Sequence, residues 1–284
     1  MFWALATAIS LHLAAGIPPS KPAETPATAP NTSRHQVSAY ESVSFDVSAE
    51  RELLKMANAD RARAGLPPLK MDDGLVQAAR AHAAKMGSQN KLSHQFSGEP
   101  SPTERISATS TLHLARIAEN VALATTAEDA HDALMASPPH RDNLLNPSYN
   151  VAGFGVFRSG NRLYVAQEFG TSMPAYSVRQ AQELLEKSVD QLRAKTKMPR
   201  LQRIEDRGMQ LSACAMAQAD SLSAAPPPAG AYMLRYTSME PETLPTNISK
   251  VIAKRGLRTY SAAACYARTQ KYPNGAYWVV LIFY

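Results

Sequence analysis

Two alternating apolar runs joined by a short polar turn constrain the fold of this chain more than any other feature. They occupy residues 151–170, VAGFGVFRSGNRLYVAQEFG, where Ser159, Gly160 and Asn161 separate the two runs. Alternation with a period of two is typical of strands, and a tight turn between two such runs predicts an antiparallel hairpin. The chain therefore contains a sheet, and other elements must cover its apolar side.

Helical and strand-like segments precede this hairpin in a simple order. Residues 48–64 and a second segment from residue 73 place apolar side chains at helical spacing. RIAENVALA at 116–124 is short and apolar like a strand, and EDAHDALMAS at 128–137 predicts a short helix. The order helix, helix, strand, helix, strand, strand predicts an α+β sandwich.

The same order of elements recurs in the second half of the chain. A second hairpin ends the sequence, turned by Pro273, Asn274 and Gly275. We interpret residues 48–172 as one domain and residues 173–284 as a smaller, diverged copy of it, against the alternative that two helix–hairpin units resemble each other by chance. At a separation of 132 positions, Leu53, Arg61, Ala62, Pro67 and Leu69 are matched by Leu185, Arg193, Ala194, Pro199 and Leu201.

The N-terminal segment predicts export from the cytoplasm. Residues 1–16, MFWALATAISLHLAAG, are apolar and end in small residues, as secretory signal peptides do, although no basic residue precedes the apolar run. Residues 17–47 are rich in Pro and Thr and predict a tether that buries no core. An uncleaved N-terminal anchor is the alternative. Beyond this segment no run of 18 apolar residues occurs, which excludes a polytopic membrane protein.

The two cysteines, Cys214 and Cys265, both lie in the second half. In an exported protein they predict one disulfide, which would stabilise the fold by on the order of 4 kcal/mol. Two buried free thiols are the alternative.

Charge is distributed unevenly between the two halves. Residues 1–172 hold 15 basic and 16 acidic residues, whereas residues 173–284 hold 15 and 8, so the second half carries a net charge of +7. This surplus predicts an anionic cell-surface partner, such as a wall polymer or membrane headgroups, with a merely soluble basic surface as the alternative. Nucleic acid is not expected as a partner, because no aromatic residues alternate with a basic groove.

Three residues of the first half form the candidate site. His94 and His140 lie in turn-like segments, and Glu119 is expected at the beginning of an apolar strand, where a carboxylate needs a partner. Two imidazoles and a carboxylate suit Zn²⁺ or another divalent metal, and they also suit a proton relay. His82, among alanines on a helix, is expected to be a buried core histidine.

Six segments, in this order, resemble the CAP superfamily of cysteine-rich secretory, venom-antigen and plant pathogenesis-related proteins, whose bacterial members are called SCP-domain proteins. The resemblance covers about residues 48–171. It implies an α-β-α sandwich, a secreted or extracytoplasmic location, and a cleft that binds divalent metal in some members. Carried over by motif, the cleft residues are His94, Glu119 and His140. The segments are ANADRARAGLPPL, AARAHAAKM, SHQF, AENVA, SPPHRDNLLNPSYNVAGFGV and YVAQEFG.

The sequence departs from the family pattern at a second cleft acid. Many eukaryotic members have a Trp followed three residues later by this acid, and the matching positions here are Leu134 and Ser137. Ser137 and Asn143 are expected at the margin of the cleft. No residue is assigned a catalytic role.

Three functions stay open at this point. The first is a secreted or cell-surface protein whose His/Glu cleft binds a divalent metal or a small ligand. The second is a metal-assisted, protease-like hydrolase, although no nucleophile elbow or zinc-protease motif occurs. The third is an extracytoplasmic carrier of lipids or sterols, which the resemblance allows.

Overall fold

The computed structural model describes residues 44–223 and 229–284 of the 284-residue chain. The chain divides into two units, residues 1–39 and 40–284, and every described residue belongs to the second unit. The predicted signal peptide at 1–16 lies outside the described residues, as does the predicted tether at 17–47 except for its last four residues. Over the described ranges, none of the helices combines the length and apolar character that crossing a bilayer needs.

The first half of the described chain builds a five-stranded sheet. Its strands follow the order β1-β4-β5-β3, all antiparallel to their neighbours, and β2 pairs with β4 in parallel. The hairpin predicted at 151–170 is confirmed as β4 and β5. The elements are β1 (Ser44–Phe45), α1 (Val47–Arg63), β2 (Lys70–Met71), α2 (Asp73–Gln89), α3 (Pro102–Thr109), β3 (His113–Ala124), α4 (Ala127–Ala136), α5 (Pro138–Leu144), β4 (Val151–Ser159) and β5 (Arg162–Met173).

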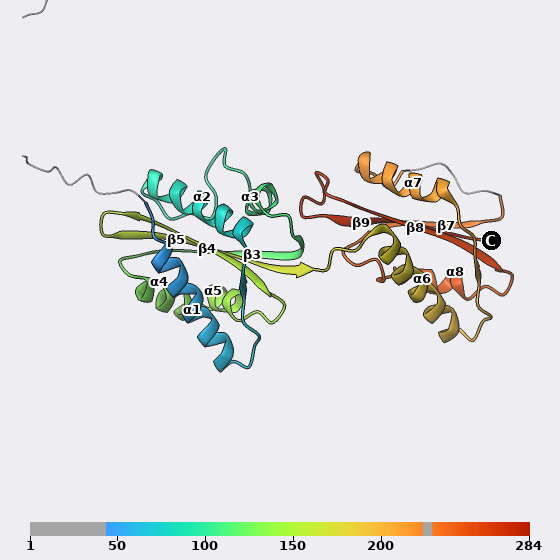
Figure 1. Ribbon diagram of the computed structural model, residues 1–284, viewed down its shortest axis with the longest axis horizontal. Coiled ribbons are helices and arrows are strands. Elements are labelled where there is room, and N and C mark those ends of the chain that lie inside the picture. The colour runs from blue at the N-terminus through green and yellow to red at the C-terminus, as the bar shows by residue number, and fades with distance from the viewer. Residues whose placement is uncertain (1–43, 224–228) are drawn as a thin grey trace, which may run out of the picture. The chain divides into compact units, whose positions relative to one another are not determined.

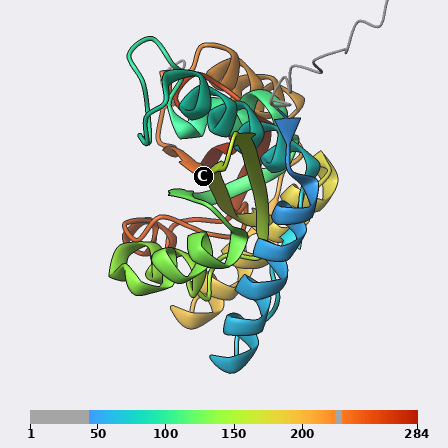
Figure 2. The same ribbon diagram turned by 90° about the vertical axis from the view of Figure 1, so that its left-hand side faces the viewer.

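Helices cover both faces of this sheet. Helices α2 and α3 lie on one face, and α1, α4 and α5 lie on the other (Figure 1). The view turned by 90° shows the same three layers (Figure 2). The predicted α-β-α sandwich is therefore confirmed.

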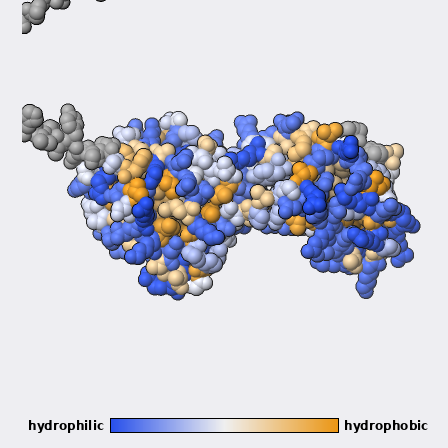
Figure 3. All heavy atoms as spheres, viewed as in Figure 1, coloured by the Kyte–Doolittle hydropathy of each residue, from blue (hydrophilic) through white to orange (hydrophobic). Residues whose placement is uncertain are grey.

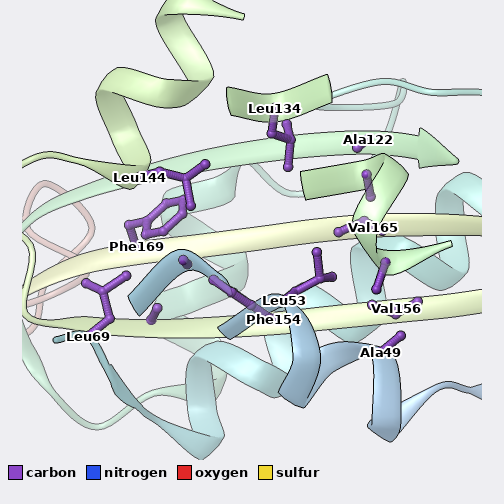
Figure 4. Close-up of a cluster of buried hydrophobic side chains, with 14 of the residues drawn as sticks. Ala49, Leu53, Leu69, Ala122, Leu134, Leu144, Phe154, Val156, Val165 and Phe169 are labelled. Carbon is purple, nitrogen blue, oxygen red and sulfur yellow. The ribbon is translucent and has the colours of Figure 1, made fainter. Parts of the chain in front are cut away.

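The two faces of β4 are packed differently because its residues alternate in size. Phe154 and Val156 are fully buried against Leu53 of α1 (Figure 4). On the opposite face, Gly153 and Gly155 let α2 approach the strand backbone. A Cβ atom built at Gly155 would lie 2.2 Å from the backbone nitrogen of Arg80, so only glycine allows this packing.

The helices begin at residues whose side chains cap them. Asp46 accepts a hydrogen bond from the backbone nitrogen of Ala49 at 3.0 Å and starts α1. Helix α3 begins with a capping box of Ser101 and Glu104, followed by Pro102 at the first helical turn. This helix lies between the predicted second helix and the predicted strand at 116–124, in a polar stretch whose sequence predicts no element.

The second half of the described chain builds a second sheet with the strand order β6-β8-β9-β7. This order repeats the path β2-β4-β5-β3 of the first sheet, and β6 again pairs in parallel with its neighbour. The predicted smaller α+β copy is therefore confirmed. Its elements are α6 (Val178–Lys195), β6 (Gln202–Arg203), α7 (Arg207–Gln218), β7 (Tyr232–Ser238), α8 (Ile248–Ile252), β8 (Thr259–Ala267) and β9 (Ala276–Phe283).

One buried arginine holds the same loops in both copies. Arg61 of α1 is fully buried and donates to the backbone carbonyls of Pro67, Leu144, Asn146 and Tyr149, each at 2.9 Å. Arg193 of α6, 132 positions later, is 1% exposed. It donates to the carbonyls of Pro199 at 2.8 Å, of Lys254 at 3.0 Å and of Ile252. The shared contacts support the interpretation of an internal duplication.

The predicted disulfide is confirmed. Cys214 of α7 and Cys265 of β8 are bonded, with their Cα atoms 5.1 Å apart and a sequence separation of 51. The bond joins the second helix of the copy to its sheet, beside the fully buried core around Trp278 and Val280. The alternative of two free thiols is excluded.

Candidate functional site

Glu119 is a buried carboxylate held by a histidine. It lies in the middle of β3 rather than at the beginning of a strand, because β3 begins at His113. Its side chain is 3% exposed, and Oε1 lies 2.9 Å from Nδ1 of His94. The side chain of His94 is 55% exposed. The strand carboxylate therefore has the histidine partner that its position requires, and the far edge of that imidazole faces solvent.

Arg105 is a second partner of the same carboxylate. It lies on α3 with its side chain 6% exposed, and Nη2 donates to Oε2 of Glu119. Nη1 donates to the carbonyl of Pro100 at 3.0 Å. Both oxygens of Glu119 are thus engaged, one by an imidazole and one by a guanidinium.

His140 lies next to His94, on the first turn of α5. The two ring centroids are 6.3 Å apart and the rings are nearly parallel, with 24° between their planes. Nδ1 of His140 lies 2.8 Å from Oγ of Ser137. Burial, and secondly the nearness of His94, lowers the pKa of His140 below its ordinary value. His140 is therefore biased toward the neutral ring, whose unprotonated nitrogen can accept a hydrogen bond or bind a metal.

Asn143 ties α5 to the strand that carries Glu119. Its Nδ2 donates to Oδ1 of Asn120 at 2.9 Å, and Nδ2 of Asn120 donates to the carbonyl of His140 at 3.0 Å. Asn120 is fully buried and also contacts Gln167 of β5 at 3.2 Å. These bonds fix the position of His140 relative to β3. Asn143 therefore affects the cluster indirectly, through Asn120 and the backbone carbonyl of His140.

His82 is the buried core histidine that the sequence predicts. It is fully buried, with Nδ1 2.7 Å from Oε1 of Glu99 and Nε2 2.8 Å from the carbonyl of Ser93. The second bond holds the residue directly before His94. Burial raises the pKa of Glu99, but the hydrogen bond with His82 and a backbone hydrogen bond from Phe96 outweigh it and leave the pKa below its ordinary value.

Glu168 lies beneath this cluster, opposite Glu119 in the register of β3 and β5. It is fully buried, and neither carboxyl oxygen has a hydrogen-bond donor within reach among the described residues. The nearest positive charge is Nη2 of Arg105, 3.8 Å from Oε1. Burial, followed by the charge of Glu119, raises the pKa of Glu168 well above its ordinary value. The neutral acid can then share its proton with Glu119.

The contacts of Glu119 bear on how a metal ion could be held beside the two histidines. Among the described residues, no group of three or more His, Cys, Asp and Glu side chains converges as a metal site requires. Both oxygens of Glu119 are already engaged, one by the guanidinium of Arg105 and the other by His94. What the geometry brings together is a pair of neighbouring imidazoles, His94 and His140, with Glu119 orienting His94. Metal-binding histidines commonly donate their other nitrogen to a carboxylate in this way.

Arg105, Glu99 and Glu168 belong to the cluster, but the sequence motifs single out none of the three. The Ser101–Glu104 capping box with Pro102 is a signal that could have predicted α3 and drawn attention to Arg105. The family pattern places a second acid at the position of Ser137; here Glu99 and Glu168 supply acids from other elements.

Comparisons with known proteins agree on the first half of the chain. Residues 54–169 match the family model described as "CAP: Cysteine-rich secretory protein family". The uncharacterized protein YkwD of Bacillus subtilis (strain 168) is 34% identical over 139 residues, which cover 49% of this chain and 52% of the relative. The matched region thus spans about half the length of that curated relative.

Two solved structures are each similar to a little under half of this chain. An outer surface protein from Borrelia burgdorferi has 20% identity and a TM-score of 0.43, covering 46% of this chain and 100% of that one. An extracellular protein containing a SCP domain from Bacillus anthracis has 24% identity and a TM-score of 0.40, covering 44% and 41%. Residues 54–169 are therefore a domain of the CAP superfamily, as the family model and the Bacillus subtilis relative both indicate.

Proposed function

We propose that this protein works outside the cytoplasm, as a secreted or cell-surface CAP protein. The apolar segment at 1–16 supports this proposal, because it has the form of a secretory signal. The disulfide between Cys214 and Cys265 supports it independently, because such bonds persist in oxidising compartments. The Pro/Thr-rich residues 17–47 would then separate the folded part from the membrane or the processing site.

The cleft of His94 and His140 is proposed to bind a divalent metal such as Zn²⁺, or a small ligand that an imidazole pair recognises. The observation that carries this proposal is the 2.9 Å contact between Nδ1 of His94 and Glu119. When Nδ1 donates to the carboxylate, Nε2 carries the lone pair, on a side chain that is 55% exposed. Nδ1 of His140 contacts Ser137, which leaves Nε2 of that ring available in the same way.

Calorimetric titration of the mature protein with Zn²⁺ at pH 7.5 tests the proposal. Wild type should bind saturably. His94→Ala and His140→Ala should abolish binding, and Glu119→Gln should weaken it by about 10- to 100-fold, because it loses the carboxylate that orients His94. Lys91→Ala, an exposed residue of the same loop, is the control and should bind like wild type. Equal binding by wild type and His94→Ala would disprove the site.

A hydrolase is the second candidate, and the same His94–Glu119 pair favours it. A histidine backed by a buried carboxylate can take a proton from water or from a substrate. An activity screen with and without a chelator separates this role from binding alone. Binding assays with liposomes and with sterols, run beside this screen, test the lipid-carrier alternative.

The second half of the chain is proposed to attract an anionic cell-surface component. Its net charge of +7 supports this, because a positive surface raises the local concentration of anionic polymers and headgroups. It holds no histidine, so it cannot reproduce the imidazole pair of the first half.

A further inference from the structure

A concave surface of the second half is lined mainly by cations. A cavity of about 380 Å³ lies where the loop after α6 meets the loop before β8. Hydrophilic residues dominate the visible surface around the end of α6 (Figure 3). Leu257 and Pro199 are among the cavity residues, and no acidic side chain is. Its cations are Lys197, Arg200, Arg255 and Arg258.

The internal duplication allows these four cations to be compared with the residues at the matching positions of the first copy. The shared arginine contacts align Pro67 with Pro199 and Asn146 with Lys254. The pairing of β2 with β4 and of β6 with β8 gives the same alignment, since Lys70 pairs with Val151 and Gln202 with Thr259. By this alignment, Lys197, Arg200, Arg255 and Arg258 replace the uncharged residues Gly65, Pro68, Pro147 and Asn150.

One of these replacements is unfavourable for the backbone. Gly65 has φ of 73°, and Lys197 has φ of 56° at the matching position. A residue with a Cβ atom in this left-handed conformation costs about 1–2 kcal/mol, which glycine avoids. Folding alone therefore disfavours a lysine at this position, although its positive charge adds to that of the cavity.

The charges of the cavity are mostly not neutralised by the protein. Arg200 pairs with Asp190 at 2.6 Å, but its side chain is 80% exposed. Within residues 44–223 and 229–284, no ion pair engages Lys197, Arg255 or Arg258. Burial, and then the charge of Arg258, lowers the pKa of the neighbouring Arg193. The cations therefore repel one another, and an anion in the cavity would relieve that repulsion.

We propose that this cavity is a binding site for a phosphate-bearing ligand. Three of its four cations are arginines, whose planar guanidinium groups bind phosphate oxygens in pairs. A volume of about 380 Å³ accommodates a phosphate group with part of its substituent. These residues are not those of the His94 cleft. The proposal rests on the proposed attraction of the second half to anionic components, and it names the residues that bind them.

The test is calorimetric titration of the full mature chain with inorganic pyrophosphate at constant ionic strength. Vesicles of phosphatidylcholine with phosphatidylglycerol form a second arm, which distinguishes a headgroup from a soluble phosphate source. Wild type should bind one of these probes saturably. Arg255→Gln combined with Arg258→Gln should weaken that binding by about tenfold or more. The charge-matched control, Arg179→Gln combined with Arg207→Gln, lies on α6 and α7 and should stay within about twofold of wild type.

Lys197→Gly is a second variant that guards against misfolding, because it restores the residue of the first copy at a glycine-compatible position. It should fold at least as stably as wild type and bind about threefold or more weakly. If both double variants weakened binding equally, the cavity would be rejected as the binding site, while a general attraction of the second half to anions would still hold. Absence of saturable binding by wild type to either probe would overturn the site, and absence of any salt-dependent attraction would also overturn the proposed anionic partner.

Discussion

Glu119 and Glu168 face each other across β3 and β5, and Glu119 is the one that contacts His94 and Arg105. Glu168 has no donor within hydrogen-bond distance among the described residues. Burial and the charge of Glu119 raise the pKa of Glu168. The cluster thus combines a carboxyl group that orients His94 with a second, fully buried acid beneath it whose pKa is raised.

Glu168→Gln should stabilise the protein at high pH. An acid with a raised pKa in the folded state ionises first in the unfolded chain, so wild-type stability falls as pH rises above about 4.5. Glutamine removes this dependence and can donate to Glu119. We expect a gain of about 1–3 kcal/mol at pH 8 and little change at pH 4.5, measured by urea unfolding. The exposed Glu52→Gln is the control; a variant less stable than wild type at pH 8 would contradict the assignment.

Removal of the buried arginines should destabilise the copies in which they lie. Arg61→Met leaves four backbone carbonyls without a donor, and Arg193→Met leaves three. Each should lower the free energy of unfolding by about 3 kcal/mol. Arg63→Met, on the exposed side of α1, should cost less than about 1 kcal/mol. Chemical denaturation measures all three, and a cost at Arg61 equal to that at Arg63 would refute the role of the buried arginine.

Loss of the disulfide should weaken the second half. Cys214→Ala with Cys265→Ala should lower its free energy of unfolding by on the order of 4 kcal/mol, because the unfolded chain is no longer cross-linked. Fluorescence of Trp278 reports this unfolding, since its side chain is 1% exposed and its residue pairs with Cys265 in the sheet. An unchanged midpoint would mean that the bond contributes nothing to stability.

Export can be read from the N-terminus of the native protein. We expect the mature chain to begin near Gly16 or Ile17 and to appear outside the cytoplasm. N-terminal sequencing of protein from culture fractions measures this. An intact Met1 in a cytosolic fraction would reject both the location and the role of residues 17–47.

The sequence predicts the layers of the fold better than the surroundings of the site. The alternation in residues 151–170 and the recurrence of Arg61 as Arg193 depend on local periodicity and on an internal repeat, which are visible in one sequence. Family motifs identify His94, Glu119 and His140, and the fold brings all three together.

The missing members of the cluster depend on tertiary packing. Arg105 reaches Glu119 only because α3 folds over β3, and that helix lies in a stretch with little apolar periodicity. Glu168 lies on a strand that is buried on both faces, so alternation does not show on which side it lies or what it faces. The cationic cavity depends on the fold bringing the loop after α6 to the loop before β8, and its contrast with the first copy appears only when the two copies are aligned through their sheets.

Nitrogen-15 NMR of the imidazole rings tests the central claim most directly. In the mature protein at pH 7.5 we expect His94 to carry its proton on Nδ1, toward Glu119, with an unprotonated Nε2. Addition of Zn²⁺ should shift Nε2 of His94 and His140 together and leave His82 unchanged, and the effect should weaken below about pH 6, where imidazoles protonate. A proton on Nε2 of His94, or Zn²⁺ shifts confined to other histidines, would contradict the proposed cleft.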